Sequence, residues 1–285
     1  MKNLIPFVFI ALVLFSSCQR EGSFERPTGN NNTNSDSIYL KQYTELDTTL
    51  PSGSDTLSKS ILSYDAQKRP LRGYEYDYTY SLLSTTDYFY SGSDTLPYKI
   101  VTFYEDFIEN YRDTSFLSYS NGIVSRDSTI SYNITNNIYF GTFVKIFTPS
   151  GSNTSIQSRG YYSTPPIIPD YQWTGTHLQS RVNGNLTSQD DTSTYYVKHS
   201  FRDHHEAVFD NKINPFYRVG VPYPIGSFDH QKNNLVEEIA WDLPHLYERH
   251  FQYNYIYRSD GYPLSVTITA VNSGTKRKGV FTYTD

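Results

Sequence analysis

Two stretches of this chain place an aromatic residue at every second position. Residues 74–80 read Tyr-Glu-Tyr-Asp-Tyr-Thr-Tyr, and residues 251–257 read Phe-Gln-Tyr-Asn-Tyr-Ile-Tyr. Successive side chains of a β-strand point to opposite faces, so this period of two gathers the rings on one face. A helix would scatter the same rings around its surface. Both stretches are therefore predicted to be strands with a tyrosine-rich face.

Turn signals separate these and other strand-like runs. Asn121-Gly122 and Asp260-Gly261 are typical of tight hairpin turns, and residues 65–70 end on a proline that suits the start of a new strand. The best helical candidate, Leu235–Trp241, fits a strand equally well. We therefore predict an all-β chain, folded as one large antiparallel meander of hairpins.

The aromatic content bears on how such a sheet would close. The chain has 28 Tyr, 17 Phe and 2 Trp. Tyrosine carries a hydroxyl that needs a partner, so rows of tyrosine favour a partly wet face over a dry sandwich core. We expect a curled sheet or an open, half-closed barrel; a wide barrel with a polar lumen is a further possibility. A membrane-embedded barrel is disfavoured, because the faces opposite the tyrosines carry Glu75, Asp77 and Asn254.

The first residues have the features of an export signal. Lys2 precedes an apolar run of twelve residues, 4–15, which as a helix would span roughly 18 Å, short of a hydrocarbon core of about 30 Å. Residues 14–18, Leu-Phe-Ser-Ser-Cys, resemble the lipobox of bacterial lipoproteins. That resemblance implies cleavage before Cys18 and fatty acylation of Cys18, which would anchor the chain to a membrane.

The domain organisation follows from this signal. Residues 1–17 are predicted to be a lipoprotein signal peptide and residues 18–37, polar and without apolar periodicity, a flexible tether. Residues 38–285 form the predicted antiparallel β domain. The protein is expected in the cell envelope as an outer-membrane lipoprotein, with its periplasmic or surface exposure left open.

Two segments also resemble uncharacterised Bacteroidota envelope lipoproteins with Tyr-Asp/Gly hairpin repeats, which are loosely similar to the YD repeats of RHS-type shells. The resemblance rests on residues 63–71 and 256–266, and on residues 209–216 followed by 232–236. It implies a β architecture and an envelope location. It implies no activity and no catalytic residues.

Charge and cysteine usage exclude other classes of protein. The net charge of -5 is mild and evenly spread, so no nucleic-acid partner is expected. Cys18 is the one cysteine, so there is no internal disulfide framework. Motifs for a phosphate-binding loop, a nucleophile elbow or a cofactor are absent from the sequence, although a Ser/His/Asp triad is not excluded by it.

A few residues are candidates for binding. His204 with Glu206, and Glu248 with His250, share a face if their segments are strands, but their spacing matches no standard metal site and a solvated surface is favoured. Trp173 and Trp241 are the candidates for stacking on a sugar ring, with sheet anchoring the favoured role for Trp173.

The sequence thus favours a non-enzymatic, lipid-anchored envelope protein of structural or interaction type. A surface protein that binds a glycan or nutrient is the alternative. A hydrolase ranks third. The expected partners are the membrane, through Cys18, and a glycan or another envelope protein.

Overall fold

The structure, a computed structural model, describes residues 38–48, 55–105, 109–120, 122–164, 168–183, 185–195, 199–218, 231–242 and 248–284. The predicted signal peptide, Cys18 and the predicted tether lie outside these ranges. Among the described residues, no helix is long and apolar enough to cross a membrane.

Within the described ranges, the β domain has sixteen strands and one short 3-10 helix. In chain order these are β1 (Leu40–Asp47), β2 (Asp55–Tyr64), β3 (Pro70–Asp77), β4 (Leu82–Phe89), β5 (Lys99–Glu105), β6 (Asn110–Ser120), β7 (Ile123–Asn133), β8 (Ile138–Ser150), β9 (Asn153–Thr164), β10 (Ile168–Val182), β11 (Asn185–Tyr195), β12 (His199–Ile213), η1 (Pro215–Arg218), β13 (Asn233–Asp242), β14 (Glu248–Tyr257), β15 (Pro263–Ala270) and β16 (Lys276–Tyr283).

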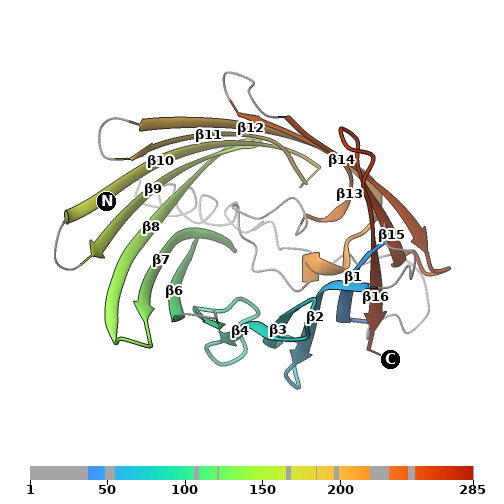
Figure 1. Ribbon diagram of the computed structural model, residues 1–285, viewed down its shortest axis with the longest axis horizontal. Coiled ribbons are helices and arrows are strands. Elements are labelled where there is room, and N and C mark those ends of the chain that lie inside the picture. The colour runs from blue at the N-terminus through green and yellow to red at the C-terminus, as the bar shows by residue number, and fades with distance from the viewer. Residues whose placement is uncertain are drawn as a thin grey trace, which may run out of the picture.

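Each strand pairs antiparallel with the next along the chain, and β16 pairs back onto β1 to close a barrel (Figure 1). The prediction of an all-β antiparallel meander is confirmed. The prediction of a curled sheet or an open, half-closed barrel is wrong, because Tyr43 pairs with Phe281 and Glu45 with Gly279 across the seam. Closure satisfies the backbone groups that two free edge strands would leave unpaired.

The helix η1 identifies the inner wall of this barrel. It lies inside the ring of strands, orange in Figure 1, and the Phe216 ring packs against Tyr43 at 5.4 Å and Phe281 at 6.0 Å between ring centroids. Tyr43 and Phe281 therefore face inward. Residues that pair across neighbouring strands point to the same face, and side chains alternate along each strand, so the strand registers identify the other inward-facing residues. Across β1 to β6 the inner row is Tyr43, Ser60, Glu75, Ser84, Tyr104 and Tyr111.

The two tyrosine runs do not share one face. Tyr253, Tyr255 and Tyr257 face inward, because Tyr255 pairs with Val266 and Val266 with Gly279 of the inner wall. Tyr74 and Tyr76 alternate with the inward Glu75 and so face outward. β3 ends at Asp77, and the remaining two tyrosines of that run, Tyr78 and Tyr80, are exposed in the following turn. The expected single tyrosine-rich face is thus divided between the two walls.

The buried apolar side chains form separate clusters along the inner wall. Leu40, Val266 and Phe281 make one cluster across the seam, Leu117, Val124, Phe147 and Ile156 a second on β6 to β9, and Leu186, Ala207 and Leu235 a third on β11 to β13. Between these clusters the inner wall is polar and partly wet. Glu75 and Tyr104 face inward and yet are exposed, as is the Arg277 side chain.

One rim of the barrel is held by a repeated contact between a tyrosine and a proline carbonyl. The hydroxyl groups of Tyr90, Tyr119 and Tyr283 donate to the backbone oxygens of Pro70, Pro97 and Pro263, at 2.9, 2.6 and 2.7 Å. In each case the tyrosine lies about 20 residues after the proline in the chain. The contact therefore ties one hairpin to the next.

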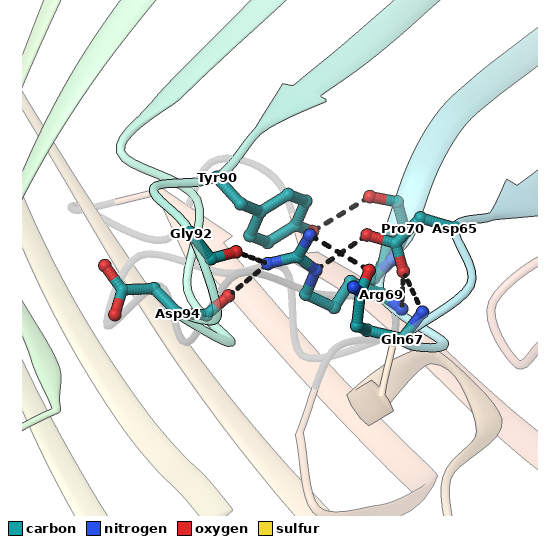
Figure 2. A network of polar contacts seen from close by, with 7 residues as sticks. All are labelled: Asp65, Gln67, Arg69, Pro70, Tyr90, Gly92 and Asp94. Atoms are coloured by element: carbon teal, nitrogen blue, oxygen red, sulfur yellow. Dashed lines mark hydrogen bonds and ion pairs between the residues drawn. The ribbon is translucent and has the colours of Figure 1, made fainter.

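Arg69 strengthens the first of these contacts. Its guanidinium group lies over the Tyr90 ring at 4.3 Å, pairs with Asp65 at 2.7 Å, and donates to the backbone oxygens of Gly92 and Asp94 (Figure 2). Arg258 lies over the Tyr283 ring in the same way, at 5.3 Å. These two places are the hairpin turns after β2 and β14, the segments that carry the sequence resemblance.

Candidate functional site

A hydrogen-bonded relay of three side chains crosses the inner wall from β9 to β11. Ser158 Oγ lies 2.9 Å from His177 Nε2, and His177 Nδ1 lies 2.6 Å from Asp191 Oδ1. All three side chains are largely buried; Ser158 is 2% exposed. We refer to Ser158, His177 and Asp191 as the inner relay.

Strand registers bring the inner relay together. His177 pairs directly with Asp191, and Ser158 pairs with Gly175, two residues before His177 on the same face. Gly175 has no side chain, so the imidazole of His177 can reach Ser158, whose hydroxyl also donates to the backbone oxygen of Gly175 at 3.3 Å. Lys145 of β8 pairs with Ser158 and therefore lies on the same inner face.

Electrostatics keep the last member of the inner relay ionised. Burial works to raise the pKa of Asp191, but hydrogen bonds from His177 and Gln189 outweigh it, so the pKa of Asp191 lies below its usual value. Gln189 Nε2 donates to the second carboxylate oxygen at 2.8 Å. On the neighbouring strand β12, burial and a hydrogen bond to Asp242 raise the pKa of Asp203, which pairs with Asp191.

A second group of polar side chains lies on the outer wall of β11 to β14. His204 Nδ1 lies 2.5 Å from Asp190 Oδ1, its Nε2 lies 3.3 Å from Glu206 Oε1, and its ring stacks on Trp241 with centroids 4.4 Å apart. His204 alternates with the inward Asp203 and His205, so this group faces outward. We refer to Asp190, His204, Glu206 and Trp241 as the outer patch.

The carboxylates of the outer patch favour a protonated histidine. Burial works to lower the pKa of His204, but hydrogen bonds to the Asp190 and Glu206 carboxylates outweigh it, so the pKa is raised above its usual value. Next to the patch, His250 Nε2 lies 2.8 Å from Glu237 Oε1. Hydrogen bonds from His250 and Gln252 lower the pKa of Glu237.

The structure brings some of the predicted site residues together. His204 and Glu206 share the outer patch with Trp241, Glu248 pairs with Trp241, and His250 pairs with Ile239 on the neighbouring strand. They do not converge on one point, and no group of three or more His, Cys, Asp or Glu within the described ranges could hold a metal ion. Trp173 lies on β10 opposite Gly160, and its side chain is outside the described part of the chain.

Sequence reasoning missed the inner relay. Ser158, His177 and Asp191 are 19 and 14 residues apart, which matches no motif. Only the registers between β9, β10 and β11 place the three side chains on one face. The adjacent residues Asp190 and Asp191 lie in β11, with one carboxylate on each wall.

The fold has a counterpart among solved structures. A crystal structure of a porin-like protein from Bacteroides vulgatus aligns with a TM-score of 0.55 at 11% sequence identity, covering 87% of this chain and 99% of that one. The two proteins share a fold. A porin-like protein from Bacteroides uniformis, also 11% identical, covers 87% of this chain and 96% of its own with a TM-score of 0.30. No protein-family model and no curated protein matches the sequence.

Proposed function

We propose that this chain is a lipid-anchored cell-envelope protein of interaction type, whose barrel stands outside the bilayer. Acyl groups on Cys18 would hold it to the outer membrane. The lipobox-like segment at residues 14–18 and a shared fold with a porin-like Bacteroides protein support the envelope location. The charged side chains of the outer wall support the other part of the proposal, that the barrel stands outside the bilayer.

A barrel that spans a bilayer presents an apolar band about 25 Å tall to lipid, and a basic residue at the midplane costs about 2–4 kcal/mol. Here the outer wall carries charges well inside the strands. Arg72 forms an ion pair with Asp87 across β3 and β4, and Glu237 lies beside His250 across β13 and β14. With the outer patch, these charges interrupt any apolar band over two separate parts of the circumference.

Two variants test the anchor and the position of the barrel. Labelling with an alkyne analogue of palmitate should mark the wild-type protein and the control Ser17→Ala, but not Cys18→Ala. A chain starting at Gln19, exported behind a signal that is cleaved without lipidation, should then appear folded in the soluble fraction.

Each arm has an outcome that contradicts the proposal. If Cys18→Ala is labelled as strongly as the wild-type protein, acylation at Cys18 is excluded. A chain without the lipid that stays in the outer membrane after an alkaline carbonate wash would show a barrel embedded in lipid.

A second candidate function, binding of a glycan, is favoured by the outer patch. An indole ring flanked by exposed carboxylates suits a sugar, because the ring stacks on C–H groups while Asp190 and Glu206 accept hydrogen bonds from hydroxyls. Binding to a glycan array should be lost in Trp241→Ala and largely kept in Trp241→Phe. Unchanged binding by both variants would exclude the outer patch as the site.

A further inference from the structure

The inner relay has the order and geometry of a nucleophile, a base and an orienting carboxylate. The Asp191 carboxylate lies against His177 Nδ1, so an imidazole with its proton on Nδ1 would donate to Asp191 and leave Nε2 as an acceptor. Ser158 Oγ is 2.9 Å from that acceptor, within reach for proton transfer. Three side chains from three strands therefore meet in the order serine, histidine, carboxylate, an arrangement that can activate a serine hydroxyl.

Ser158 also has the surroundings that such a reaction needs. The residue is 2% exposed, so water is largely excluded and hydrogen bonds at the hydroxyl act in a low dielectric. Its neighbour in register on β8 is Lys145, an inward-facing cation on the side opposite His177. Ile156, which pairs with His177, supplies an apolar neighbour on the same face.

Two other serines of the inner wall, Ser131 and Ser84, lack this combination. Ser131 is similarly buried, but its hydroxyl donates to the Asp113 carboxylate, with no histidine between them. Ser84 likewise donates to Glu75 at 3.1 Å. A serine bonded directly to a carboxylate is a satisfied polar group. Ser158 differs because an imidazole, oriented by a second group, stands between the hydroxyl and the carboxylate.

We propose that the inner relay is the catalytic site of an esterase acting on small carboxylic esters. Ser158 Oγ attacks the ester carbonyl carbon while His177 Nε2 takes the hydroxyl proton, and Lys145 faces the oxyanion. His177 returns the proton to the departing alkoxide, which leaves as the alcohol. A water molecule then gives a proton to His177 and attacks the acyl-serine, releasing the carboxylic acid and restoring the hydroxyl. Asp191 acts as a positioning residue for His177.

Covalent labelling tests the nucleophile directly. The folded full-length protein is treated with diisopropyl fluorophosphate, chosen because it is small enough for a nearly buried hydroxyl, and the adduct is located by peptide mass spectrometry. We expect one adduct, on Ser158, with Ser131 unmodified as the matched buried serine. Labelled protein should also lose hydrolysis of 4-nitrophenyl acetate. A folded wild-type protein without an adduct on Ser158 would overturn the proposal and leave the relay a structural hydrogen-bond network.

Variants separate catalysis from folding. Ser158→Ala should lower kcat/KM for 4-nitrophenyl acetate at least about 1,000-fold, whereas Ser131→Ala should leave it within about twofold. Asp191→Asn should lower the rate strongly, give a residual rate that rises steeply with alkaline pH, and be partly rescued as Asp191→Glu. Near-ultraviolet circular dichroism checks that each variant is folded. If folded Ser158→Ala and Ser131→Ala hydrolyse the ester equally, the relay is not catalytic.

This proposal and the proposed envelope function fail independently. Loss of the lipid anchor alters where the protein resides, and loss of Ser158 alters covalent labelling and ester hydrolysis.

Discussion

At the scale of single residues, tyrosine in this chain acts as a hydrogen-bonding strut as much as an apolar side chain. Tyr64, Tyr90, Tyr119 and Tyr283 each donate to a backbone carbonyl oxygen, and burial raises the pKa of all four hydroxyls. The same residue type packs its ring against the inner wall and satisfies a carbonyl group at the rim. This explains why the chain uses tyrosine where a dry core would use leucine or valine.

Removing one of these hydroxyls should have a measurable cost. Tyr90→Phe keeps the ring under Arg69 but leaves the Pro70 carbonyl without its partner, so the free energy of unfolding should fall by about 1 kcal/mol. Urea denaturation followed by circular dichroism measures the difference. Tyr78→Phe is the control, because Tyr78 is 69% exposed and should change stability little. Equal losses of stability in the two variants would show that the hydrogen bond from Tyr90 to the Pro70 carbonyl does not stabilise the fold.

The outer patch makes a prediction for pH. The pKa of His204 is raised in the folded protein, so its contribution to stability is present below the pKa of an unfolded histidine, about 6.5, and is lost as pH rises through the folded pKa. His204→Gln should therefore destabilise the protein at pH 5.5 and have little effect at pH 9. Denaturation midpoints at the two pH values measure this. A loss that is the same at both would mean that packing on Trp241, and not charge, is what His204 contributes.

At the scale of elements, the unit of construction is the hairpin with its turn. The turn after β2 and the turn after β14 share a register shift at the last tyrosine of the strand, where Tyr64 pairs with Pro70 and Tyr257 with Pro263. In the second of them Gly261 adopts a φ of +88°, a left-handed conformation that suits glycine. The turns predicted at residues 65–70 and at Asp260-Gly261 are thus confirmed.

The seam between the first and last strands depends on a close approach. A Cβ atom on Gly279 of β16 would lie 2.5 Å from Tyr43 Oη and 2.7 Å from Val266 Cγ1. Gly279→Ala should therefore force the seam apart and lower the free energy of unfolding by about 1–3 kcal/mol. Thermal unfolding measures the loss.

Gly73→Ala is the matched control for the seam. Gly73 also lies in a strand, but a Cβ there would meet Leu62 Cδ2 at 3.5 Å, an ordinary contact. Comparable losses in the two variants would show that the seam is not specially tight and that the effect is common to any strand glycine.

At the scale of the whole molecule, both walls of the barrel carry polar and charged side chains. The inner wall carries the relay and the wet tyrosines, and the outer wall carries ion pairs and the outer patch. A membrane barrel would be polar on its inner wall alone. The polar and charged side chains on the outer wall are the physical basis for the proposal that the barrel stands in water at the end of a lipid tether.

The strands, their hairpin order and several turns could be read from the amino acids, because alternation and turn preference are properties of neighbouring residues. Closure could not, since Tyr39 and Thr284, which bond across the seam, are 245 residues apart. The sequence also could not show which face of each strand points inward, because a register shift of one residue moves every side chain to the opposite wall. Residues 74 and 76 point outward, whereas residues 253 and 255 point inward. Ser158, His177 and Asp191 meet for the same reason. Local pattern specifies a strand, whereas the pairing of distant strands specifies which side chains meet.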